Sequence, residues 1–162
     1  MKSIYRARRL TLQAMFCLDA QGNRVWNLIE EFISDSGESP EVISAARKFT
    51  REAFDNRAEC DAILTRHAKH WDLNRLAMVD RNILRLAVQE LRAGETPFKV
   101  IVTEAIKLAK EFSSAEAPRF INGILDAVAK EIRGETSKDD ADNEIIDDLA
   151  DTEDEIITDE ED

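Results

Sequence analysis

Four basic residues precede the first acidic residue of the chain: Lys2, Arg6, Arg8 and Arg9. The aromatic Phe16 follows Arg9 by seven residues, a spacing that places both on one face of a helix. A protein that binds single-stranded nucleic acid needs positive charges that pair with the phosphates and an aromatic ring on which an unstacked base can stack. Four basic residues near the start of a helix are also typical of a solvated helix end. This pattern alone therefore does not distinguish a nucleic-acid site from a solvated helix end.

Residues that could support catalysis are few. Neither serine nor cysteine stands in a nucleophile elbow, no glycine-rich phosphate loop occurs, and His67 and His70 are the only histidines. The two cysteines, Cys17 and Cys60, form no CxxC pair and are expected to be buried free thiols in a reducing cytosol. Five acids on predicted helices could in principle pair around a metal ion: Asp80, Glu90, Glu104, Asp126 and Glu131. Acids on outer helix faces are more often solvent contacts, so we expect neither enzyme activity nor a cofactor or metal.

The elements that position these residues are predicted to be helices throughout. The chain has 162 residues, 43% of them hydrophobic, with only five Gly and three Pro and no alternating strand pattern. Apolar residues recur at three- and four-residue intervals, and we expect six or seven helices. Their approximate ranges are 5–21, 25–33, 40–70 as one helix, straight or bent, 78–92, and two more within 97–133. In the first, Ile4, Ala7, Leu10, Ala14 and Leu18 are expected to be buried, with arginines 6, 8 and 9 pointing outward.

The last two predicted helices are joined by a short turn. Ser113 followed by Glu116 fits a capping box, and Pro118 suits a first helical turn. Gly123 stands inside the second helix at a cost of about 1 kcal/mol relative to alanine. A close backbone approach is the expected reason for that glycine.

Charge divides the chain into two parts. The net charge is −12, but residues 135–162 hold 15 of the 34 acids and one of the 22 bases, so the remaining 134 residues carry a net charge of +2. We therefore expect a helical domain over 1–134 and a disordered acidic tail over 135–162. Isoleucines and a leucine in the tail leave open a short acidic helix that docks on a basic surface. No signal peptide or membrane span is expected.

An ordered series of motifs resembles the NusB family of bacterial transcription antitermination factors. The motifs are RARRLTLQAMF at 6–16, WDLNRL at 71–76, VDRNILRLAVQEL at 79–91, K-V-x-V-x-E-A at 99–105, L-A-K-x-F at 108–112 and PRFINGILD at 118–126. No single tripeptide is specific, but the series is, and it covers roughly residues 4–133.

The resemblance implies a compact all-α bundle in two subdomains that binds a boxA-type single-stranded RNA together with NusE, a ribosomal protein. It implies an RNA site made of Lys2, Arg6, Arg8, Arg9, Phe16, Arg119 and Phe120, and a partner contact at Asp80. It further implies action in the cytoplasm on ribosomal RNA transcription, through other Nus factors and the RNA polymerase elongation complex. Phe120 is expected either to stack on a base or to belong to the core.

Two departures from the family pattern concern the RNA side. Many relatives carry Glu-Asp-Ser before the P-R-F motif, whereas this chain has Ala115, Glu116 and Ala117, and relatives often have tyrosine where Phe16 stands. Two other functions remain alternatives. One is the RNA-targeting module of a ribosomal RNA methyltransferase system, and the other is a protein-only adaptor that uses the tail for recognition.

Overall fold

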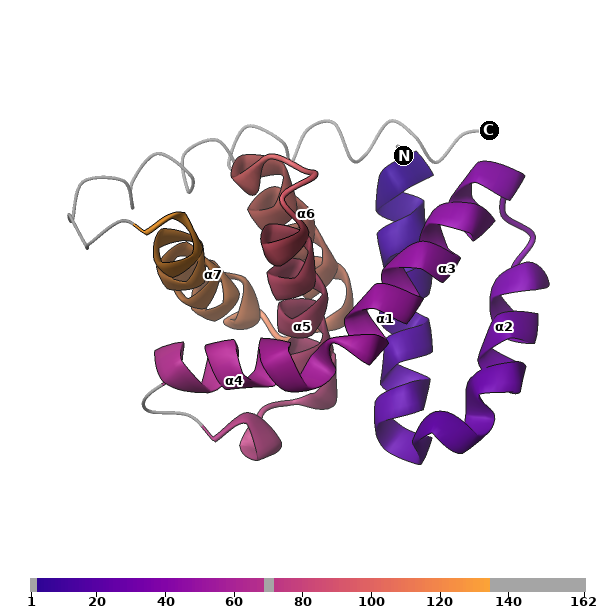
Figure 1. Ribbon diagram of the computed structural model, residues 1–162, viewed down its shortest axis with the longest axis horizontal. Helices are drawn as coiled ribbons and strands as arrows, with labels where there is room; N and C mark the ends of the chain where they lie inside the picture. The colour runs from indigo at the N-terminus through magenta and orange to yellow at the C-terminus, as the bar shows by residue number, and fades with distance from the viewer. Residues whose placement is uncertain (1–2, 69–71, 135–162) are drawn as a thin grey trace.

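The computed structural model describes residues 3–68 and 72–134, and in these the fold is all-α, as predicted (Figure 1). The seven α-helices are α1 (Ser3–Gln21), α2 (Trp26–Ser34), α3 (Pro40–Asp55), α4 (Arg57–His67), α5 (Met78–Ala93), α6 (Phe98–Phe112) and α7 (Ala117–Arg133). Short 3₁₀ helices lie at Asn23–Val25 and Leu73–Arg75. The predicted acidic tail lies outside the described residues. None of the described helices has the length and apolar character that crossing a bilayer requires.

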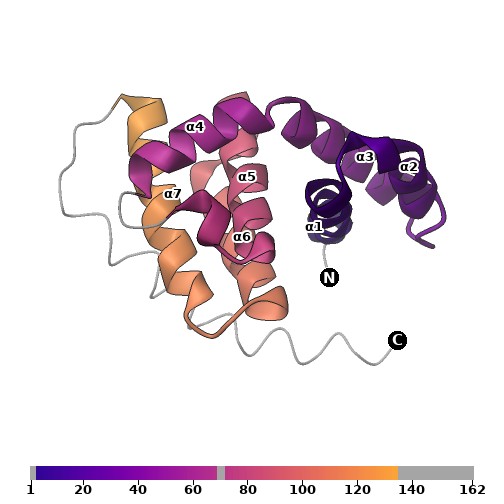
Figure 2. The same ribbon diagram turned by 90° about the horizontal axis from the view of Figure 1, so that it is seen from below.

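The helices form two groups on either side of α1 (Figures 1 and 2). Helices α2 and α3 pack on one flank of α1 around a small apolar cluster. The larger cluster lies on the other flank, among α4, α5, α6 and α7. Each group buries its own apolar stripes, and α1 contributes to both clusters.

Two different faces of α1 supply these clusters. Ala7, Leu10, Ala14 and Leu18 face α2 and α3, as the periodicity predicted. Tyr5, Leu12 and Met15 belong to the larger cluster. The prediction that Ile4 is buried is wrong, because its side chain lies at the open start of the helix and is 38% exposed.

The segment 40–70 forms two helices rather than one. The first begins as expected, with Pro40 in its first turn and the Ser39 hydroxyl accepting a hydrogen bond from the Val42 N–H at 3.3 Å. It ends at Asn56, whose φ of −103° and ψ of 14° depart from helical values and whose side-chain amide, together with its backbone N–H, donates to the Glu52 carbonyl. Helix α4 then leaves in a new direction across the larger cluster (Figure 1).

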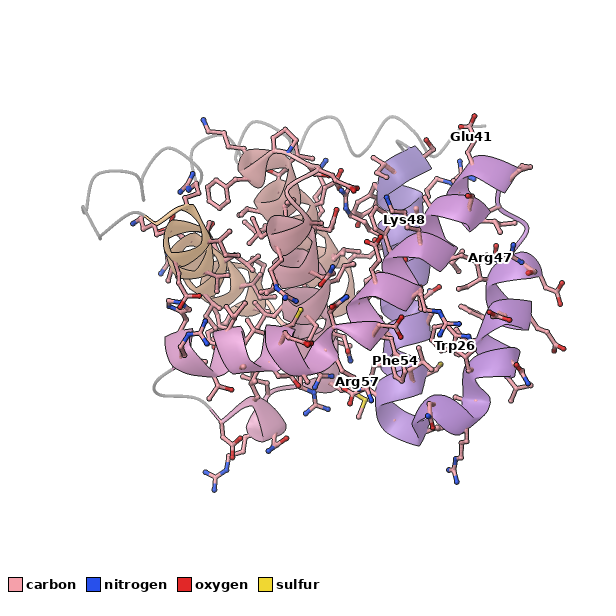
Figure 3. The ribbon with its side chains drawn as sticks, viewed as in Figure 1. Trp26, Glu41, Arg47, Lys48, Phe54 and Arg57 are labelled. Atoms are coloured by element: carbon pink, nitrogen blue, oxygen red, sulfur yellow. The ribbon has the colours of Figure 1, made fainter. Side chains whose placement is uncertain are left out.

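Stacked side chains fix this corner to α2. The rings of Trp26 and Phe54 lie 5.3 Å apart, with the Arg57 guanidinium 4.0 Å from the Phe54 ring centroid (Figure 3). The guanidinium of Arg51 lies 3.8 Å from the Trp26 centroid. The stack closes the open end of the smaller helix group beside α1.

Candidate nucleic-acid interface

Arg6 and Arg9 project from the start of α1 into partly solvated positions. Arg6 pairs with Glu38 in the loop before α3. The Arg9 guanidinium lies 2.8 Å from a Glu111 carboxylate oxygen and 5.7 Å from the centre of the Phe112 ring. Both arginines are one-third or more exposed, so each keeps hydrogen-bonding capacity for a phosphate. Lys2 lies outside the described residues.

Arg8 does not point outward, and that prediction is wrong. Its side chain is only 2% exposed, and its guanidinium donates to both carboxylate oxygens of Glu90, the shortest contact being 2.6 Å. A second guanidinium nitrogen lies 3.6 Å from Glu104. The reason is the helix period: position 8 falls on the face of α1 that turns toward α5 and α6, where both acids are buried. Arg8 is thus placed to hold α1 in the fold, out of reach of a phosphate.

Phe16 lies two helical turns after Arg9 and is 40% exposed. A ring with this exposure is available for stacking, as its spacing from Arg9 predicted. Because it is phenylalanine, it adds no hydrogen-bonding hydroxyl to this surface.

The turn between α6 and α7 is fixed differently from the predicted capping box. The Ser113 hydroxyl donates to Asp80 at 2.5 Å, and the N-cap residue of α7 is Glu116, which makes no side-chain capping bond. The capping-box prediction is wrong because Ser113 ends α6, and α7 begins only four residues later, at Ala117. Pro118 does lie in the first turn of α7, as predicted.

Polar bonds tie the ends of four helices together on one side of the molecule. Tyr5 donates to Glu111 at 2.8 Å, and Arg9 pairs with the same carboxylate, so the start of α1 is held against the end of α6. Burial, reinforced by that hydrogen bond, raises the pKa of Tyr5 well above its ordinary value. The Ser113–Asp80 bond then joins the end of α6 to the start of α5, and α7 begins four residues later. This side lies away from α3 and α4 (Figure 2).

Arg119 and Phe120 occupy the first turns of α7 on this side. Arg119 is exposed and forms no ion pair in the part of the chain that the structure describes. Phe120 is half-buried and packs against the larger apolar cluster, so it is neither a fully buried core residue nor a fully open platform. An unpaired guanidinium beside an aromatic ring suits a single-stranded nucleic acid.

Gly123 follows one turn later in an exposed position of α7. A Cβ atom built on it would meet no atom within 4 Å, and its φ is not positive. The predicted close approach within the chain is therefore wrong, because this face of α7 turns away from the helices that cover its neighbours Ile121, Ile124 and Leu125.

Other chemistry finds little support. Across residues 3–68 and 72–134, no three or more His, Cys, Asp and Glu side chains are grouped so as to hold a metal ion. A cleft of about 480 Å³ lies between the end of α1 and the α3–α4 corner. Among its charged lining residues, Asp19 and Asp61 are both paired with Arg85.

Comparisons with known proteins agree with the fold and the motif series. The sequence profile of the NusB family matches residues 5–130. The transcription antitermination protein NusB of Solibacter usitatus is 42% identical over 134 residues, which cover 82% of this chain and 92% of that protein. The NusB structure from T. maritima is 35% identical with a TM-score of 0.73, and covers 79% of this chain and 91% of its own.

A further solved structure contains antitermination factors NusB and NusE in complex with dsRNA. Its matching chain is 26% identical with a TM-score of 0.71, and the match covers 81% of this chain and 98% of that chain.

Proposed function

The chain belongs to the NusB family of transcription antitermination proteins, and from that premise we propose that it binds a boxA-type single-stranded RNA together with NusE. Antitermination is a non-enzymatic role. In this proposal the bound complex acts in the bacterial cytoplasm on ribosomal RNA transcription. It reaches the RNA polymerase elongation complex through other Nus factors.

The observation that carries the proposal is the joining of three surfaces on one side of the molecule. The outward arginines of α1, the Asp80 end of α5 and the α6–α7 turn are linked through Glu111 and Ser113. Arg6, Arg9 and Arg119 supply charge for phosphates, and Phe16 and Phe120 supply rings for bases. Arg8 contributes by holding α1 in place.

The direct test is a titration of a short fluorescent boxA-like RNA with the protein, with and without NusE. We expect saturable binding that NusE tightens and that a scrambled RNA of the same composition does not reproduce. Equal binding of both RNAs in the presence of NusE would contradict the proposal and favour an adaptor without RNA specificity.

The charged part of the site has a measurable salt signature. Replacing Arg6, Arg9 and Arg119 together with alanine should lower RNA affinity about tenfold at low salt. It should also reduce the slope of log K against log salt, by about 0.7 for each phosphate that the protein no longer neutralises. The measurement is fluorescence anisotropy over a salt series.

The matched control replaces two cations on the other side of the molecule, Arg47 and Lys48 on α3 (Figure 3). That variant should keep the wild-type slope, because it alters net charge without touching the site. If both variants lose slope equally, the binding reflects overall charge and the site is misplaced.

Asp80 is proposed as a contact for a basic residue of NusE. Asp80→Asn should weaken binding to NusE about fivefold and make it less sensitive to salt, because one charge pair between the two proteins is removed. Ser113→Ala is the control, since it removes the hydrogen bond to Asp80 but keeps the carboxylate charge. Isothermal titration with NusE alone distinguishes the two. Equal losses in both variants would assign Asp80 to fixing the turn rather than to the partner.

A further inference from the structure

Nothing within the described residues explains why position 123 is a glycine. Glycine is the poorest helix former after proline, yet it stands in the middle of α7 with ordinary helical geometry. The space around it is open, since an added Cβ would meet nothing within 4 Å. Neither backbone conformation nor internal packing therefore calls for glycine here, which directs attention to a molecule that approaches from outside.

The neighbours of Gly123 on the helix surface indicate what that molecule is. Arg119 precedes it by four residues and Phe120 by three, so both flank it on the same exposed face. A guanidinium without an ion pair in the described chain lies on one flank, and an aromatic ring on the other. Between them, the bare backbone offers a flat surface with no side chain.

We propose that one nucleotide of a single-stranded RNA lies flat against the backbone of α7 at Gly123, between Arg119 and Phe120. This inference rests on the proposed function and names a contact within that site. Glycine is the residue that lets a ligand approach a backbone closely, and a Cβ would lift the base away from the helix. The backbone N–H of Gly123 is already bonded within the helix, so the contact is one of stacking rather than hydrogen bonding.

The Arg119 guanidinium attracts a phosphate, which places the sugar-phosphate strand on the Arg119 side of the bound base. A protein segment could also use a bare helix face, so the test includes NusE by itself.

Gly123→Ala gives effects of opposite sign on folding and on binding. The melting temperature should rise by about 3 to 5 °C, because alanine favours the helix and meets open space. The Kd for the boxA-like RNA should rise about tenfold with an unchanged salt slope, since the variant gives up one stacked base and no charge. Binding to NusE without RNA should not change.

Ser44→Ala on α3 is the matched control, because it also replaces an exposed helical residue with alanine, away from the site. It should raise the melting temperature slightly and leave RNA binding as in the wild type. RNA binding by Gly123→Ala within twofold of wild type would overturn the inference. A loss seen with NusE alone would assign the glycine to the protein partner and overturn it too. Wild-type protein in the same assay separates the two hypotheses, since failure of wild type to bind the RNA contradicts the proposed function itself.

Discussion

Replacing Arg8 with methionine should lower the free energy of unfolding by about 3 to 5 kcal/mol. The reason is that Glu90 and Glu104 would be left buried without the guanidinium that neutralises them. Urea denaturation followed by circular dichroism measures the change. Arg6→Met is the matched control, because Arg6 lies two residues before Arg8 but pairs at the surface, and it should cost less than about 1 kcal/mol.

A second variant keeps the prediction testable if Arg8→Met does not fold. Exchanging Arg8, Glu90 and Glu104 together for apolar residues of similar size should recover most of the lost stability, since no buried charge then remains unpaired. Equal unfolding midpoints for Arg8→Met and Arg6→Met would contradict the burial of Arg8.

Asp19 should show the next largest effect. Near the end of α1 it accepts hydrogen bonds from Arg81 at 2.7 Å and from Asn82 at 3.0 Å, and it lies 3.1 Å from Arg85. Asp19→Ala should cost about 2 to 3 kcal/mol, because Arg81 loses its carboxylate partner in a mostly buried position. Asp55→Ala, which removes an exposed carboxylate 3.9 Å from Arg51, should change stability by less than about 0.5 kcal/mol.

The pH dependence of the Asp19 effect has a definite sign. Burial by itself raises the pKa of Asp19, but the hydrogen bonds from Arg81 and Asn82 and the charge of Arg85 outweigh it and hold that pKa below its ordinary 3.8. The ionised form therefore stabilises the fold fully above about pH 4, and this contribution is lost as the pH falls through the lower folded-state pKa. The stability difference between wild type and Asp19→Ala should be constant near neutrality and shrink in acid. A difference that grows in acid would contradict this assignment.

The all-α fold could be predicted from the sequence because each helix carries a 3.6-residue apolar period and few glycines or prolines interrupt it. The break at Asn56 was missed because it has no proline or glycine to mark it. At Asn56 the backbone departs from helical dihedral angles, and the side-chain amide adds a bond to the carbonyl of the preceding turn. Local patterns thus located the helices better than their ends.

The sequence indicated which residues belong to the candidate site, but it did not indicate where all of their side chains point. Periodicity places Arg8 on a face of α1, yet only the fold shows that this face meets Glu90 and Glu104. Ser113 followed by Glu116 satisfies a local rule for capping, which fails because Ser113 ends α6 and α7 begins only at Ala117. Gly123 was noticed as costly, but the open space around it could be seen only in the structure.

The buried pairing of Arg8 also sets an order of events during synthesis on the ribosome. Glu90 is made 82 residues after Arg8, which at about 5 to 20 residues per second is a delay of roughly 4 to 16 s. During this interval Arg8 has neither of its buried carboxylate partners, because Glu90 and Glu104 both lie later in the chain. The arrangement in which Arg8 turns inward while Arg6 and Arg9 face outward can form only after α5 has been translated. The proposed RNA surface on α1 is therefore complete only after α5 has been made.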